Sequence, residues 1–157
     1  MHILSILAGL LFVFAAGAQD GYRIKHEETI CEVLCRFGDK PNSKEITKVK
    51  RALEHVQAWP SAYAEREGIR MDRQRMPARI VFADEIVGYK LGLLGEGQTL
   101  IVGYSDPKHD RILVTGVDLD TLYHEFAHWF FSGAASHAER STRDTCEDFA
   151  EYCAKQK

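Results

Sequence analysis

A short run near the C-terminus contains the residue types that bind a catalytic metal ion. His124-Glu125-Phe126-Ala127-His128 is an H-E-x-x-H sequence within a segment of helical periodicity. On an α-helix, His124 and His128 lie one turn apart on the same face, so both imidazoles can reach one metal ion. Glu125 is turned about 100° around the helix axis, where it can exchange a proton with a metal-bound water. The spacing therefore predicts a hydrolytic zinc site.

The helix that carries this motif is predicted to be buried. Apolar side chains occupy most of its circumference between residues 119 and 131, and a helix that is apolar nearly all round packs inside a protein. The remaining stripe consists of Thr121, His124, Glu125 and His128. These buried polar groups need partners, which a zinc ion and its water would supply. The alternative is a pair of core histidines with Glu125 at the surface, and the match of motif and helical context disfavours it.

Two histidines leave a tetrahedral zinc ion short of one protein ligand. The extended motif with a third histidine is absent, because Phe131 and Ala134 stand at its glycine and histidine positions. The carboxylates downstream are Glu139, Asp144, Glu147, Asp148 and Glu151. On the last predicted helix, Glu147 borders an apolar stripe and is therefore the carboxylate best aimed at the motif helix. That stripe consists of Cys146, Phe149, Ala150 and Cys153.

The motif, 18 further residues and then Glu147 resemble the HExxH-x18-E pattern of gluzincin metallopeptidases. The resemblance covers roughly the last third of the chain, and the short length looks most like the minigluzincins, single-domain zincins reduced to the catalytic core. It implies that one Zn²⁺ ion is bound by His124, His128 and Glu147. It also implies that Glu125 is the catalytic general base and that Glu151 orients the first histidine.

The same resemblance implies a substrate-binding edge strand and a donor to the oxyanion. We expect the edge strand, which would pair with extended substrate, to be one of the two strands of the hairpin before the motif, with Arg111–Thr115 preferred. The oxyanion donor in such families is a Tyr, His or Arg side chain. Those available here are Tyr104, His109, His137, Arg140 and Tyr152, and we prefer His137, in the loop after the motif helix.

The elements that must position these residues form one α+β domain with the zincin-like order of helices, small mixed or antiparallel sheet, then helices. N-terminal helices are predicted over 24–37 and, with Asn42 and Glu45 as a capping box, from 43 to Trp59. Strands are expected over 78–83, 99–104 and 111–115, with a weak one between 86 and 94. The motif helix and the glutamate helix, the latter capped by Ser141 or Thr142, are expected over 119–131 and 142–155.

Residues 1–18 predict a cleaved signal peptide. They are almost wholly apolar, contain no Asp, Glu, Lys or Arg, and end in Ala16-Gly17-Ala18, a small-x-small cleavage site. Cleavage would leave residues 19–157 as the catalytic domain. The protein is then expected to be secreted or periplasmic, with no membrane attachment after cleavage.

Export gives the four cysteines an oxidising environment, in which two disulfides are expected. Cys31 and Cys35 lie at i, i+4 on one predicted helix, and Cys146 and Cys153 at i, i+7 on another. Bridges between the helices are therefore easier to build than bridges within either. A four-cysteine zinc site is disfavoured because the usual C-x2-C spacing is missing.

The charge balance excludes one further class of function. The 157 residues contain 20 Lys and Arg against 23 Asp and Glu, and this net charge of −3 argues against nucleic-acid binding through bulk charge. We expect a monomeric zinc metallopeptidase that acts on a peptide or protein substrate. The alternatives are an exported zinc-binding pseudopeptidase and a latent enzyme whose Cys31 or Cys35 fills the fourth zinc position. The presence of Glu125 favours the enzyme over the pseudopeptidase.

Overall fold

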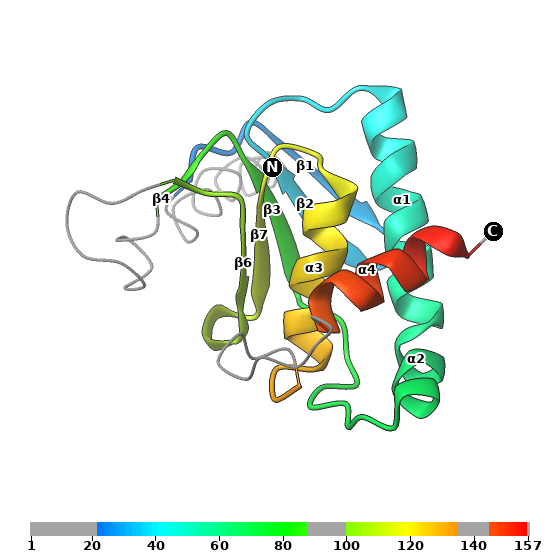
Figure 1. The fold of residues 1–157 in the computed structure, drawn as a ribbon. Coiled ribbons are helices and arrows are strands. Elements are labelled where there is room, and N and C mark those ends of the chain that lie inside the picture. The colour runs from blue at the N-terminus through cyan, green and yellow to red at the C-terminus, as the bar shows by residue number, and fades with distance from the viewer. Residues whose placement is uncertain (1–21, 88–99, 135–144, 157) are drawn as a thin grey trace, which may run out of the picture.

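The computed structural model describes residues 22–87, 100–134 and 145–156 (Figure 1). The predicted signal peptide at 1–18 and the expected caps Ser141 and Thr142 lie outside these ranges. The strands are β1 (His26–Ile30), β2 (Val33–Phe37), β3 (Arg79–Ala83), β4 (Ile86–Val87), β5 (Leu100–Ile101), β6 (Gly103–Asp106) and β7 (Arg111–Thr115). The helices are α1 (Ser43–Ala58), α2 (Pro60–Glu67), the 3-10 turn η2 (Pro107–His109), α3 (Leu119–Phe130) and α4 (Thr145–Lys155).

The main sheet is mixed, with the strand order β1-β2-β3-β7-β6. The inner pairs β2–β3 and β3–β7 are parallel, whereas the outer pairs β1–β2 and β6–β7 are antiparallel. β4 and β5 form a separate antiparallel pair. The predicted α+β class with a small mixed sheet is confirmed. The strand expected over 99–104 is divided, because β5 pairs with β4, whereas β6 begins at Gly103 and forms the hairpin with β7.

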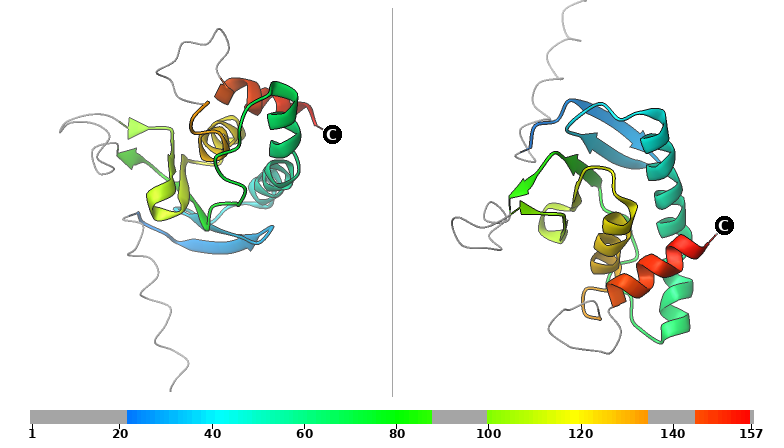
Figure 2. Two further views of the ribbon diagram at one scale, coloured as in Figure 1. Left: turned by 90° about the horizontal axis from the view of Figure 1, so that it is seen from below. Right: turned by 45° about the horizontal axis from the view of Figure 1, so that its top comes forward.

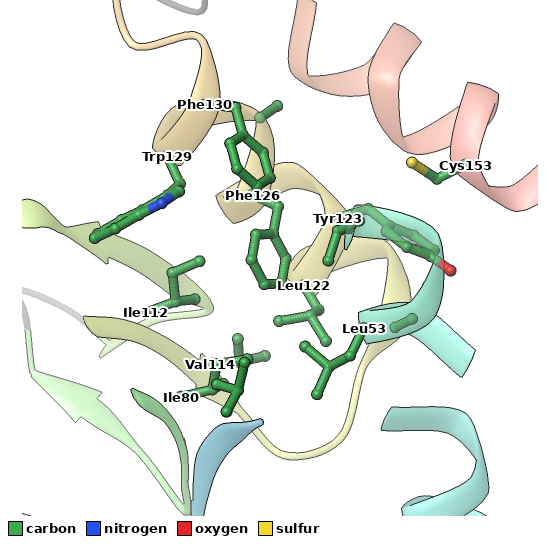
Figure 3. Close-up of a cluster of buried hydrophobic side chains, with 14 of the residues drawn as sticks. Leu53, Ile80, Ile112, Val114, Leu122, Tyr123, Phe126, Trp129, Phe130 and Cys153 are labelled. Carbon is green, nitrogen blue, oxygen red and sulfur yellow. The ribbon is translucent and has the colours of Figure 1, made fainter. Parts of the chain in front are cut away.

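Successive side chains of the inner strands point to opposite faces of the sheet and enter two different cores, a larger one and a smaller one. Ile80 and Phe82 of β3 belong to the core beneath the helices, whereas Val81 and Ala83 belong to a smaller cluster. This period of two is the side-chain alternation of a strand buried on both faces. Figure 3 shows part of the larger core, in which residues of α1, α3 and α4 pack against those of β3 and β7. Its labelled members are Leu53, Ile80, Ile112, Val114, Leu122, Tyr123, Phe126, Trp129, Phe130 and Cys153.

The helix predicted over 24–37 is wrong, because this segment forms the β1–β2 hairpin. Its turn residues Cys31 and Glu32 have φ angles of 48° and 66°, a left-handed conformation that Gly or Asn usually supplies. The sequence therefore lacks the ordinary hairpin signal. Pairing of β2 with β3, which lies far along the chain, adds the long-range contacts that favour the extended form.

The second predicted helix is confirmed as α1. The side chain of Asn42 accepts from the backbone of Lys44 and Glu45, while the Glu45 carboxylate accepts from the Asn42 N–H, which completes the capping box. The segment after Pro60 is also helical. Proline is favourable at the first position of a helix, so Pro60 begins α2, which ends at Gly68 with φ 66°.

The motif helix α3 begins where predicted. The Asp118 side chain accepts from the Thr121 N–H and caps the helix. α3 packs against β6 and β7 on one side and against α4 on the other. Both views of Figure 2 show α4 lying beside α3 and reaching towards α1 and α2.

Candidate metal centre

A cleft of about 1110 Å³ opens between β6, α3 and α4. In Figure 1, α3 lies between β6 and α4, and side chains of all three elements line the cleft. The polar stripe of α3 that the sequence predicted faces this space, because the apolar remainder of the helix is packed in the core. The cleft-lining residues of α3 are Asp120, Thr121, His124, Glu125 and His128.

Both predicted histidine ligands lie in the cleft. His124 and His128 are half-buried, and their ring centroids are 5.0 Å apart with an interplanar angle of 69°. Their arrangement follows from the one-turn spacing on α3. The two imidazoles are therefore brought together as the motif required.

Cys146 of α4 completes a group of three metal-ligating side chains. One ligand atom from each of His124, His128 and Cys146 lies within 4.8 Å of the other two. The Cys146 Sγ is 3.5 Å from the His128 Nε2, and Cys146 is fully buried. Imidazole nitrogen and thiolate sulfur are donors that zinc prefers, so this group could hold a metal ion.

From the sequence, Cys146 is expected in a disulfide and in an apolar stripe, and the four-cysteine zinc site that would include it is disfavoured by spacing. A signal for a ligand was present in the sequence, since Cys146 directly precedes Glu147 at the start of α4. A cysteine adjacent to an expected metal ligand is a second candidate donor, because thiolate sulfur binds zinc. The sequence does not distinguish a packing role of Cys146 from a metal-binding role, because both place a cysteine on the inner face of a helix.

The two predicted carboxylates of α4 line the same cleft. Glu147 is exposed, and its carboxylate is not among the ligand atoms that cluster in the described ranges. Glu151, also exposed, forms an ion pair with Lys155 one turn on. A role for Glu147 as zinc ligand, or for Glu151 behind a histidine, remains a prediction.

Glu125 is held against the edge of the sheet. It is 6 % exposed, and the backbone of Ser105 on β6 hydrogen-bonds to its carboxylate. Burial raises the pKa of Glu125 to about 7, and the Ser105 hydrogen bond opposes this effect. Beside it, the Ser105 hydroxyl is buried and has no hydrogen-bond partner among the residues that the structure describes. The site thus contains a buried carboxylate next to two imidazoles.

Of the two hairpin strands, the preferred Arg111–Thr115 is not an edge strand. This strand, β7, lies between β3 and β6, so its backbone groups pair with neighbours on both sides. β6 is the edge of the main sheet, and its residues Gly103, Tyr104 and Ser105 line the cleft. The chain reverses at η2 and returns β7 to the interior, and only the tertiary pairing reveals which strand is outermost.

The candidate oxyanion donors are separated by the fold. Tyr104 is half-buried and lines the cleft. His109 is directed to Asp106, with its Nδ1 2.8 Å from the Asp106 Oδ2. The ring of Tyr152 lies under the guanidinium of Arg66. The preferred candidate His137, and Arg140, lie outside the described residues.

None of the four cysteines forms a disulfide in the structure. The expected bridges were to join two helices, but Cys31 and Cys35 lie on the β1–β2 hairpin and not on a helix. That hairpin is at the edge of the sheet opposite to β6, which also removes the basis for a latent enzyme plugged by Cys31 or Cys35. The thiol that does reach the histidines is Cys146.

Comparison of the chain with protein-family models, curated proteins and solved structures gave no match. Among the residues with described structure, no helix has the length and apolar character needed to cross a membrane.

Proposed function

We propose that this protein is a zinc-dependent metallopeptidase with a zincin-like arrangement, exported by its N-terminal segment and active as a monomer. The observation that carries the proposal is the buried Glu125 carboxylate beside His124 and His128 in one cleft. A buried acid costs free energy, and nothing in the packing of α3 requires one. A metal ion with a reactive water gives this arrangement a use.

Different residues of the site would bind the metal ion and transfer the proton. His124 and His128 would hold the zinc ion, with a third donor from the first turn of α4, where Cys146 and Glu147 are adjacent. When bound, zinc supplies Lewis-acid activation of a carbonyl and of a water. Glu125 accepts the proton of the attacking water and passes it to the leaving amine. Three protein ligands leave a tetrahedral position open, as in catalytic rather than structural zinc sites.

The cleft also supports an extended peptide as substrate. β6 is an edge strand and runs along one wall; the Ser105 backbone is hydrogen-bonded to Glu125, and pairing with another chain would use the remaining outer backbone groups of the strand. Leu100 and Val102, 62 % and 70 % exposed, line the same wall and offer apolar contact. The substrate is therefore a peptide or an extended segment of a protein.

Replacement of Glu125 by Gln tests the mechanism. The zinc content of Glu125→Gln should equal that of the wild type, because the change preserves shape and leaves both histidines in place. Hydrolysis of a diverse peptide library, mapped by mass spectrometry, should fall by a factor of about 100 or more. Glu54→Gln, on the far helix α1, is the matched control and should keep full activity.

Two results would contradict the proposal. Unchanged hydrolysis in Glu125→Gln would remove the general base from the mechanism. A wild-type protein that binds zinc firmly but cleaves no peptide of the library would instead indicate the pseudopeptidase.

A further inference from the structure

The distance between Cys146 and His128 matches the geometry of two ligands on one zinc ion. Zinc lies about 2.3 Å from a thiolate sulfur and about 2.0–2.1 Å from an imidazole nitrogen, at tetrahedral angles. These values place the sulfur and nitrogen about 3.6 Å apart. The Cys146 Sγ and the His128 Nε2 are 3.5 Å apart, so the spacing of these two donors matches that of two ligands on one zinc ion.

The position of Cys146 is fixed by the packing of α4. Cys146 and Phe149 are fully buried, and the Phe149 ring packs edge-on against Tyr63 and Phe131. One residue after Cys146, Glu147 is exposed. A short side chain held by a packed helix loses little freedom when it binds a metal, whereas an exposed glutamate loses more.

We propose that Cys146 is the third protein ligand of the zinc ion, in the place that the resemblance to gluzincins gives to Glu147. The site is then a His₂Cys centre with one open position. This inference rests on the proposed zinc site but not on turnover. A thiolate donates more negative charge to the metal than an imidazole does, because a bound thiolate is anionic and a bound imidazole is neutral.

The competing explanation is a metal-free contact in which the Cys146 thiol donates a hydrogen bond to the His128 imidazole. It predicts no direct bond between sulfur and metal. Cobalt(II) distinguishes the two explanations, because a thiolate bound to cobalt(II) absorbs strongly in the near ultraviolet through charge transfer, and a thiol nearby does not.

The experiment is a cobalt(II) and zinc titration of the purified protein and three variants. The wild type should show the thiolate band with one equivalent of cobalt(II). Cys146→Ser should lose the band, and its zinc affinity should fall by more than the roughly 10–100-fold that loss of an outer partner costs. Cys153→Ser, two turns along the same helix and equally buried, is the matched control and should keep both. Glu147→Gln should keep the band and lose less than about tenfold in zinc affinity.

Two additional measurements protect the test against misfolding of Cys146→Ser. Cys146→Asp offers a carboxylate of similar size, and it should bind cobalt(II) without the thiolate band. In the wild type, zinc should slow alkylation of Cys146 by iodoacetamide by at least about tenfold, as judged by peptide mapping, and should leave Cys31 unaffected.

Three outcomes would overturn the inference. They are a cobalt(II) protein without a thiolate band, a greater loss of zinc affinity in Glu147→Gln than in Cys146→Ser, or a disulfide at Cys146 in protein isolated without reductant. A thiolate band with no hydrolysis dependent on Glu125 would support the ligand and contradict only the proposed function.

Discussion

Gly103 of β6 passes directly over Glu125 of α3. A Cβ atom on Gly103 would lie 2.7 Å from the Glu125 Oε1, 2.8 Å from its Cγ and 2.7 Å from the Thr121 Cγ2. No carbon atom is tolerated at such distances. The close approach of the edge strand to the motif helix therefore depends on a residue without a side chain, and it positions the buried carboxylate.

Replacement of Gly103 by Ala should displace Glu125 while the histidines stay in place. We expect hydrolysis to fall by about 100-fold, since misplacement of a catalytic group by about 1 Å has effects of this size. Zinc content should be unchanged. Gly133→Ala is the control, because a Cβ there would meet nothing nearer than 3.5 Å, and it should retain full activity. Loss of zinc from Gly103→Ala would show that the strand positions the whole site rather than Glu125.

Asp106 should make the fold sensitive to acid. Burial alone would raise the pKa of Asp106, but hydrogen bonds and charge from Arg111 and His109 outweigh it and lower the pKa below 3.8. A lowered pKa stabilises the fold above the unfolded value and loses this effect as the pH falls through the folded value. Asp106→Asn should therefore reduce the free energy of unfolding by about 2–3 kcal/mol at neutral pH. In urea titrations this difference should shrink below pH 3.8; a constant difference would contradict the prediction.

A hydrogen bond between α1 and α3 should contribute measurably to stability. The His55 Nδ1 lies 3.0 Å from the Tyr123 hydroxyl, and His55 is half-buried. A double-mutant cycle with His55→Ala and Tyr123→Phe should give a coupling energy of about 1 kcal/mol in urea unfolding. Additive effects would mean that the contact contributes nothing.

The tyrosine at the α2–α4 contact should stabilise the helix that carries Cys146. The Tyr63 hydroxyl is 3.1 Å from the Asp148 Oδ2, and both residues are buried. Tyr63→Phe removes this donor from a buried carboxylate and should lower the free energy of unfolding by about 1–3 kcal/mol. Tyr152→Phe is the control, since its ring packs on the same Arg66, and its stability should change by less than about 0.5 kcal/mol. Equal effects of the two changes would contradict this role of the Tyr63 hydroxyl.

Local sequence determined the elements whose signals lie within a few residues. The capping box at Asn42 and the cap at Asp118 locate the starts of α1 and α3, and the apolar circumference of α3 leaves one polar stripe. That stripe predicts that His124, Glu125 and His128 face one space, and in the structure all three line the cleft. These features depend on helix geometry alone and so could be predicted from the sequence.

Tertiary structure decided the features that depend on pairing between distant segments. The hairpin around Cys31 forms although its turn lacks Gly and Asn, because β2 pairs with β3. β6 rather than β7 is the edge strand because β7 also pairs with β3. The thiol of Cys146 meets His128 because α4 packs on α3. Local propensity contains no information on these partners, since each contact joins residues whose separation along the chain exceeds the length of one helix or hairpin.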